Sequence, residues 1–211
     1  MTVPDAAKSL HEQGREAGSR GDYAEALTLL TEAAAIAPDW PYPIYDRAFT
    51  HLKLGDAQAA LADYRRTLEL APRGFFTAHV AVDTLQREQR GELPTGLYLA
   101  YSTLESMPED SRRQVIPQLV EKFPGFAPAW LLFAKLTEDP HERLQRIETG
   151  LQADPDPETR GMLKLNQAFV LTQLGQAAEA EAIFNALLRD PETTIGVVAW
   201  AKVMVTRKTA D

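Results

Sequence analysis

The 211-residue sequence contains no cysteine, so disulfide frameworks, thiolate nucleophiles and thiolate metal sites are excluded. It also lacks long apolar runs. No stretch approaches the roughly 18 apolar residues that would span a bilayer, and residues 1–9 have neither the basic start nor the apolar run of a secretory signal. We therefore expect a soluble protein of the cytoplasm that does not bind a membrane.

Positive charge is scarce as well. The chain has 22 lysine and arginine residues against 30 acidic ones, which gives a net charge of -8. Affinity for nucleic acid depends largely on basic side chains that neutralise phosphates. The basic pairs Arg65-Arg66 and Arg112-Arg113 stand alone rather than in a cluster interleaved with aromatic residues. Nucleic acid is therefore not an expected partner.

Motifs that carry catalysis or bind cofactors are absent. There is no G-x-S-x-G nucleophile turn, no glycine-rich phosphate loop and no H-E-x-x-H pair. His79 and Asp83, four residues apart on one expected helix, could offer two metal ligands, but a solvated polar pair explains them better. We expect no catalytic residue, no metal site and no cofactor. An enzyme or metal protein that uses His79 and Asp83 is the alternative.

The sequence does contain an internal repeat, which indicates a tandem-repeat architecture. Residues 7–40 align with residues 41–74 at a constant offset of 34, without a gap. The identical pairs are Gly21-Asp22 with Gly55-Asp56, Ala26-Leu27 with Ala60-Leu61, and Ala37-Pro38 with Ala71-Pro72. The pattern returns in residues 159–192 and, in weaker form, in 75–108 and 125–158.

Each repeat is predicted to form two helices. Apolar residues recur every four positions within 41–54 and again within 57–70, which is the spacing of one helix face. A Gly-Asp pair separates the two halves, at 55–56 in this unit and at 21–22 in the preceding one. Glycine tolerates a positive φ and aspartate can cap the following helix, so the pair is typical of a tight turn between helices.

These residues resemble the tetratricopeptide repeat, whose pattern is W-x2-L-G-x2-Y followed by Ala, an aromatic residue and Pro over 34 residues. The positions that carry the resemblance are Leu10, Gln13, Gly14, Ala17, Ala26, Leu30 and Pro38 in the first unit, Ile44, Arg47, Ala48, His51, Ala60, Tyr64 and Pro72 in the second, and Lys164, Gln167, Ala168, Leu171, Ala180, Phe184 and Pro191 in the last. The resemblance covers nearly the whole chain. It implies an all-α fold, a right-handed superhelical solenoid of helix hairpins, and a function in binding other proteins.

We expect a single domain over residues 1–211. Its expected parts are the two-helix units 7–40, 41–74, 75–108, 125–158 and 159–192, an orphan helix 109–123, and a terminal capping helix 195–208. Pro117 lies inside the orphan helix, which should therefore start late, kink or split. The terminal segment is rich in β-branched residues that would also suit a strand, but its position directly after a repeat-closing proline favours a helix.

In repeats of this kind the first helix of each pair lines a concave groove, so the resemblance implies a binding surface there. The side chains expected to face it are Tyr42, Tyr45, Asp46, Phe49, Phe76, His79 and Asp83. The stripe Tyr42, Tyr45 and Phe49 is suited to anchor an extended segment or an amphipathic helix of a partner protein. For Phe76 and the adjacent Phe75, packing against the next repeat is equally expected.

One known class of ligand is not expected. Family members that clamp the C-terminal carboxylate of chaperones use cationic and amide side chains on the first helices. Here Arg15 alone keeps that charge, and Asp46 would repel a carboxylate.

The expected function is therefore a non-catalytic scaffold or adaptor that binds a protein or peptide partner in the groove. An alternative is a homo-oligomer, such as a homodimer, assembled through the terminal helix with Trp200, Val203 and Met204 as contacts. The last helix of a solenoid should present a polar outer face, and this one has only a narrow polar stripe.

Overall fold

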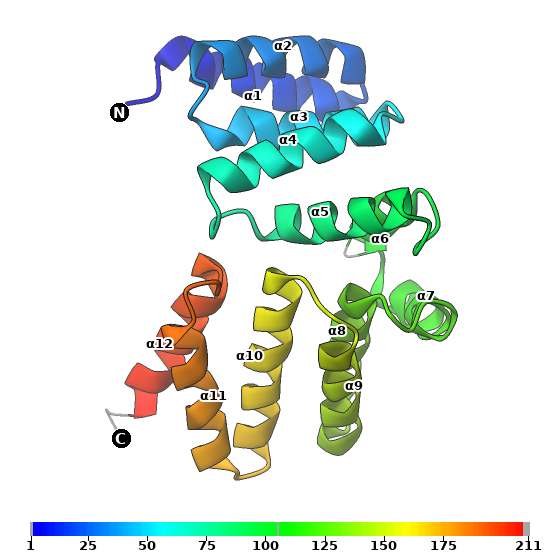
Figure 1. Ribbon diagram of the computed structural model, residues 1–211, viewed down its shortest axis with the longest axis vertical. Helices are drawn as coiled ribbons and strands as arrows, with labels where there is room; N and C mark the ends of the chain where they lie inside the picture. Colours follow the sequence, from blue (N-terminus) through cyan, green and yellow to red (C-terminus); the bar gives the residue numbers. More distant parts are fainter. Residues whose placement is uncertain (1, 105, 209–211) are drawn as a thin grey trace. The chain divides into compact units, whose positions relative to one another are not determined.

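All regular structure in residues 2–104 and 106–208 is α-helical (Figure 1). The structure is a computed structural model that describes those residues, apart from the side chains of Phe76, Arg207 and Lys208. It divides into two compact units, unit 1 up to Leu99 and unit 2 from Ala100 onward. The predicted all-α class built from helix hairpins is confirmed. The single domain over residues 1–211 stays a prediction.

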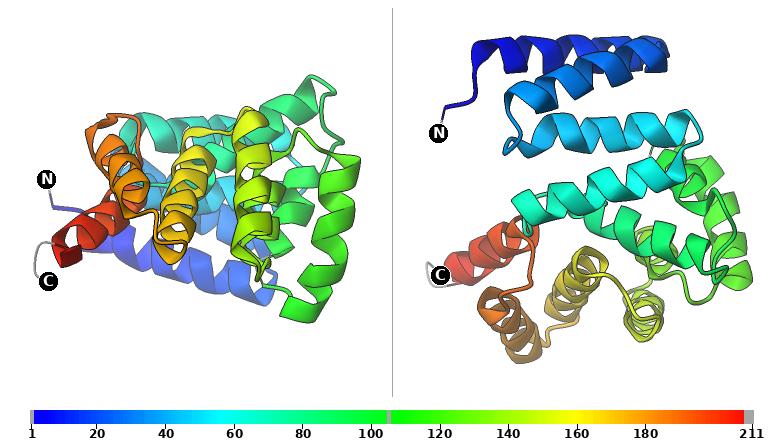
Figure 2. Two further views of the ribbon diagram at one scale, coloured as in Figure 1. Left: turned by 90° about the horizontal axis from the view of Figure 1, so that it is seen from below. Right: turned by 45° about the horizontal axis from the view of Figure 1, so that its top comes forward.

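Unit 1 is a stack of consecutive helices (Figure 2). They are α1 (Asp5–Arg20), α2 (Tyr23–Ile36), α3 (Pro41–Lys53), α4 (Ala57–Leu70) and α5 (Phe76–Gln89), followed by the start of α6 (Leu97–Leu104). From α1 to α5 each helix packs against the next along the chain, and α1 also contacts α3. This is the order expected of stacked hairpins, in which the first helices α1 and α3 are neighbours.

The Gly-Asp turns form as the sequence predicts, with one difference. Gly21 and Gly55 end α1 and α3 with φ values of 88° and 82°, a region that glycine reaches without a steric penalty. Asp56 caps α4, since its carboxylate accepts a hydrogen bond from the backbone N–H of Ala59 at 2.9 Å. The side chain of Asp22 makes no such bond to α2, so the expected capping role applies to Asp56 alone.

Small residues at the helix interfaces let the hairpins of unit 1 close tightly. Ala26, Ala48 and Ala60 have no exposed surface. A Cβ added at Gly14 would lie 2.8 Å from Cγ of Leu30, closer than side-chain carbons approach one another. The small residues of the repeat pattern therefore set the spacing between paired helices.

The turn after α5 is held by a buried carboxylate. Glu88 is 8% exposed, and its two oxygens accept backbone hydrogen bonds from Gly96 at 2.9 Å and Tyr98 at 2.7 Å. These amides lie at the start of α6, where backbone N–H groups lack partners within the helix. Glu88 therefore closes the turn over residues 90–96, which is longer than the turn over residues 54–56 between α3 and α4.

Unit 2 begins with the rest of α6 and continues through six helices. They are α7 (Glu109–Lys122), α8 (Ala127–Lys135), α9 (Pro140–Gln152), α10 (Pro157–Gln173), α11 (Ala177–Arg189) and α12 (Ile195–Lys208). The pairs α8 with α9 and α10 with α11 are hairpins, and α9 packs on α10. The helix α7 packs against α8, and α12 packs against both α11 and α10.

Pro117 neither delays nor splits α7, so those two expectations are wrong. The helix runs without interruption from Glu109 to Lys122, with Pro117 inside it. Proline removes the N–H that would bond the carbonyl of Arg113 four residues earlier. Ile116 and Val120, both buried, hold the helix in place across the proline, so tertiary packing outweighs the local cost.

The terminal segment is a helix, as its position after Pro191 predicts, and not a strand. Val197 and Ala201 have no exposed surface and belong to the core that α10 and α11 form. Gly161 on α10 gives Val197 room, since a Cβ there would lie 3.1 Å from a methyl group of Val197. One face of α12 is thus part of the core of unit 2.

Candidate functional site

The aromatic stripe predicted on α3 has two exposed rings and one that is half-buried. Tyr42 is 53% exposed and Phe49 is 36% exposed, seven residues apart on the same side of the helix. Tyr45 lies between them and is half-buried. The ammonium group of Lys53 lies 5.1 Å from the centre of the Phe49 ring.

Tyr45 packs within unit 1. Its ring centre lies 5.7 Å from that of Tyr64 on α4 and 5.1 Å from that of Phe75, which precedes α5. Its hydroxyl is hydrogen-bonded to the hydroxyl of Thr77 on α5. Burial raises the pKa of Tyr45 above its ordinary value. Tyr45 therefore ties α3 to α4 and α5, and a role in holding a partner stays a prediction.

A row of aromatic rings continues from this stripe toward α1. We call Trp40, Tyr42, Phe75 and Tyr45 the aromatic row. The ring centre of Tyr42 lies 5.0 Å from that of Phe75 and 6.0 Å from that of Trp40. The imidazole of His11 on α1 stacks edge-on against Trp40 at 4.9 Å. Neither Trp40 nor His11 is among the predicted groove residues, because Trp40 precedes α3 and lies outside the helix periodicity, and His11 lies at a buried position of α1.

Asp46 is tied to α1 by two cationic or potentially cationic groups. The Nε2 atom of His11 donates to the Asp46 carboxylate at 2.7 Å, and Nε of Arg15 lies 3.7 Å from the same oxygen. His11 is buried, and the Asp46 side chain is 28% exposed. The expected groove residue Asp46 thus joins the first helices of two successive repeats.

The predicted residues on α5 have separate partners. The Nε2 atom of His79 donates to the backbone carbonyl of Pro72 at 2.9 Å, and Asp83 forms an ion pair with Arg87 at 3.7 Å. The side chain of Phe76, also predicted, lies outside the described residues. Within the described ranges no three His, Asp or Glu side chains are grouped so that they could hold a metal ion.

An open cleft runs along α1 beside the aromatic row, and we call it the α1 cleft. It is lined by Lys8, His11, Glu12, Arg15, Glu16, Ser19 and Trp40. The ammonium of Lys8 pairs with Asp5 at 2.8 Å, and Arg15 pairs with Asp46. Glu12 and Glu16 are exposed, and neither has an ion-pair partner among the residues that the structure describes.

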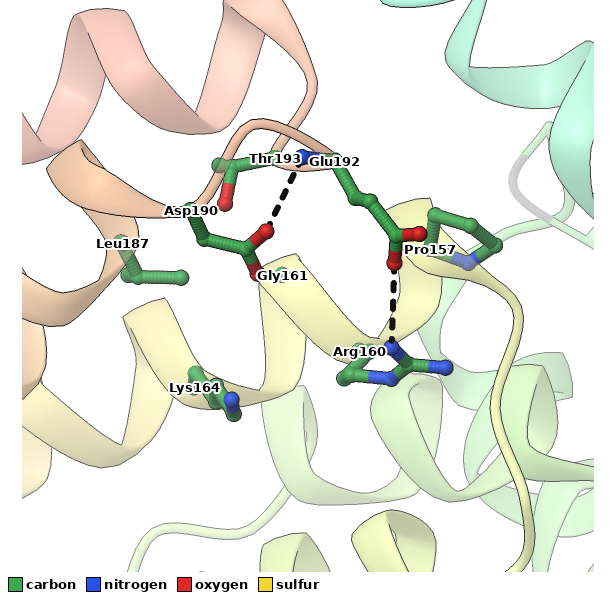
Figure 3. Close-up of a pocket in the computed structure, with 8 residues that line it drawn as sticks. All are labelled: Pro157, Arg160, Gly161, Lys164, Leu187, Asp190, Glu192 and Thr193. Atoms are coloured by element: carbon green, nitrogen blue, oxygen red, sulfur yellow. Dashed lines mark hydrogen bonds and ion pairs between the residues drawn. The ribbon is translucent and has the colours of Figure 1, made fainter.

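Unit 2 has a small pocket between α10 and the loop before α12 (Figure 3). Arg160 points from α10 toward Glu192, and the two form an ion pair at 3.8 Å. Asp190 accepts a hydrogen bond from the backbone N–H of Glu192 at 2.9 Å. The Arg160–Glu192 pair therefore joins the loop to α10, and the Asp190 hydrogen bond closes a turn within the loop.

The outer face of α12 is apolar and exposed. Ile195 is 60% exposed, Trp200 58% and Val203 41%. Met204, the third contact predicted for an oligomer, is partly buried and packs against the core of unit 2. The structure therefore brings Trp200 and Val203 to the surface and turns Met204 toward the interior.

A helix that crosses a bilayer needs about 20 predominantly apolar residues. No helix within residues 2–104 and 106–208 is long and apolar enough to cross a membrane.

No protein-family model matches the chain, and no curated protein matches it. Several solved structures are similar. They include MamA from residue 41 to the end from Desulfovibrio magneticus RS-1 (21% identity over 88% of this chain and 94% of that chain, TM-score 0.43), a thermophilic TPR protein of Thermus thermophilus (20%, 95% and 100%, TM-score 0.39), and the flexible tandem repeat domain of a bacterial cellulose synthase (20%, 99% and 94%, TM-score 0.38). These TM-scores are too low to support a fold assignment, so the fold is assigned from features of the chain itself. Its helix hairpins, its period of 34 residues and its glycine turns are those of a fold like that of the tetratricopeptide repeat.

Proposed function

We propose that the chain is a non-catalytic adaptor that binds a segment of another protein along the face of unit 1 formed by α1, α3 and α5. The observation that carries the proposal is the exposure of Tyr42 and Phe49, two large rings on one side of α3. The core of the hairpin is formed by other residues, including Ile44 and Ala48, which are buried. The two rings are therefore free to contact a partner without unfolding the hairpin.

The physical basis is the burial of aromatic surface. Tyrosine is among the residues that dominate binding energy, and a true anchor contributes about 2 kcal/mol or more. Tyr45 supports the surface from behind because its contacts with Phe75 and Thr77 fix the ring against which Tyr42 stacks. A surface held in place in advance loses less entropy on binding. An extended segment or an amphipathic helix with apolar side chains fits such a row.

The test is a capture experiment with a double variant, Tyr42→Ala with Phe49→Ala. We expect proteins captured from native lysate by the wild-type chain to be lost by this variant. The matched control is Ile36→Ala with Leu54→Ala, which removes two exposed apolar side chains from other positions in unit 1 (44% and 48% exposed). Far-UV circular dichroism checks that both variants are folded. If both variants capture the same proteins as the wild type, the assignment of this face is wrong.

A second candidate function is self-association through α12, and the exposure of Trp200, Val203 and Ile195 favours it. Burying this face against a second copy would remove apolar surface from water, at about 25 cal/mol per Å². Light scattering over a range of concentrations is the test. A dimer that Trp200→Glu converts to a monomer supports the candidate, and a wild-type chain that stays monomeric throughout eliminates it.

A further inference from the structure

Resting on the proposed function, we propose a chemical identity for one part of the partner. The α1 cleft binds an arginine side chain, with an apolar side chain two residues away on Tyr42.

The residues that line the cleft carry two cations and two carboxylates, and counting Asp5 and Asp46, which pair with the cations, leaves an excess of two negative charges. Its two cations are already paired, Lys8 with Asp5 at 2.8 Å and Arg15 with Asp46 at 3.7 Å. Glu12 and Glu16 line the same cleft and have no ion-pair partner in the described part of the chain. A cationic group from a partner would therefore be attracted, while an acidic segment would be repelled.

The aromatic wall favours arginine over lysine. The indole of Trp40 lines the same cleft as the two unpaired carboxylates. A guanidinium group is planar, stacks on aromatic rings, and presents a fork of N–H donors that matches carboxylates. Glu12 and Glu16 are one turn apart on α1, a separation of about 5–6 Å between Cβ atoms, which a guanidinium can bridge. An ammonium group offers neither the flat surface nor the fork.

The distance between the rings of Trp40 and Tyr42 predicts how far apart the two contacting side chains lie along the partner segment. The centres of the Trp40 and Tyr42 rings lie 6.0 Å apart. An extended chain rises about 3.3 Å per residue, so side chains two residues apart are separated by about 6.6 Å and point to the same side. When an arginine of the partner stacks on Trp40, the partner's side chain two residues further along therefore lies over Tyr42, which is 53% exposed. The expected ligand pattern is Arg-x-apolar.

The experiment uses the full chain and a defined probe, the peptide acetyl-Gly-Arg-Gly-Phe-Gly-amide. The nuclear magnetic resonance signals of the indole N–H groups show which tryptophan the peptide approaches. The chain has three tryptophans, Trp40, Trp130 and Trp200. We expect a saturable shift of the Trp40 signal alone. Replacing arginine by citrulline keeps the shape and removes the charge, which should weaken binding by about tenfold, the difference between a charge-assisted and a neutral hydrogen bond.

The protein-side test is Glu12→Gln with Glu16→Gln, which preserves the size of both side chains. We expect binding of the arginine peptide to weaken by about tenfold or more and its dependence on salt to diminish. The control is Glu32→Gln on α2, an exposed glutamate that does not line the cleft, and it should have no effect.

Three results would overturn the inference. They are no saturable shift of Trp40 with the arginine peptide, equal binding of the citrulline peptide, or unchanged binding by the Glu12 and Glu16 double variant. None of these bears on the capture experiment with Tyr42 and Phe49, which tests the proposed function separately. A failed arginine test with a successful capture test would leave the face as a binding surface of different ligand chemistry.

Discussion

Replacing Tyr45 tests whether its side chain stabilises the packing of unit 1 or serves only to contact a partner. Removing a fully buried aromatic ring costs about 3–5 kcal/mol. Tyr45 is half-buried between Tyr64 and Phe75, so we expect Tyr45→Ala to lower the free energy of unfolding of unit 1 by about 2–3 kcal/mol. Tyr45→Phe keeps the ring and loses the hydrogen bond to Thr77, at a cost of about 1 kcal/mol or less.

The assay is urea unfolding followed by tryptophan fluorescence. A background with Trp130→Phe and Trp200→Phe leaves Trp40, in unit 1, as the single reporter. The control is Tyr42→Ala, which removes a ring that is 53% exposed and should cost less than about 1 kcal/mol. The packing role of Tyr45 is contradicted if Tyr45→Ala lowers the free energy of unfolding by less than about 0.5 kcal/mol and by no more than the Tyr42→Ala control does.

Three further changes test the packing of unit 1. Gly14→Ala should destabilise it by up to about 2 kcal/mol, because crowding against Leu30 (about 1–3 kcal/mol) outweighs the gain in helix propensity (about 1 kcal/mol). Asp63→Ala should cost about 3 kcal/mol, since it leaves a half-buried arginine without its two 2.7 Å hydrogen bonds. Raising the pH above about 10, the ordinary pKa of tyrosine, should also destabilise unit 1. Burial raises the pKa of both Tyr45 and Tyr64, so the stability they contribute when neutral is lost as the pH rises through those values.

Each of these changes has a measurement that can contradict it. Gly18→Ala is the control for Gly14, since the nearest atom to its added Cβ is 3.8 Å away, and it should stabilise the helix in the same urea assay. Asp39→Ala removes an exposed carboxylate paired at 3.9 Å and should change stability by less than about 0.5 kcal/mol. If Asp63→Ala lowers the free energy of unfolding no more than Asp39→Ala does, the pair of Asp63 with Arg47 does not stabilise unit 1. Tyrosine absorbance during an alkaline titration should show that Tyr45 and Tyr64 ionise as unit 1 unfolds. Ionisation of both side chains near the ordinary pKa of tyrosine, with the fold intact, would contradict the prediction.

The elements that sequence predicted well are those with a local physical cause. Gly21 and Gly55 end their helices because only glycine reaches a positive φ at no steric cost, so their spacing gave the hairpin period directly. The terminal helix follows from its position after Pro191. Even there, the burial of Val197 depends on room that Gly161 provides on a neighbouring helix, and the terminal segment alone does not reveal it.

The parts that sequence did not predict depend on side chains from neighbouring elements. Tyr45 has the register of a groove residue, but Phe75 and Thr77 from the following repeat cover part of it. Trp40 lies in a loop between helices, where periodicity gives no signal. Pro117 neither delays nor splits its helix, although local propensity alone would favour that, because packing against α8 holds α7 together.

The central claim is that the exposed rings of α3 bind a partner, and isothermal titration calorimetry tests it most directly. The titrant is the protein captured by the wild-type chain. Two anchors worth about 2 kcal/mol each amount to about 4 kcal/mol, so Tyr42→Ala with Phe49→Ala should raise the dissociation constant by about 700-fold. The Ile36→Ala with Leu54→Ala control should bind as the wild type does. Dissociation constants within about twofold of one another for all three proteins would contradict the claim.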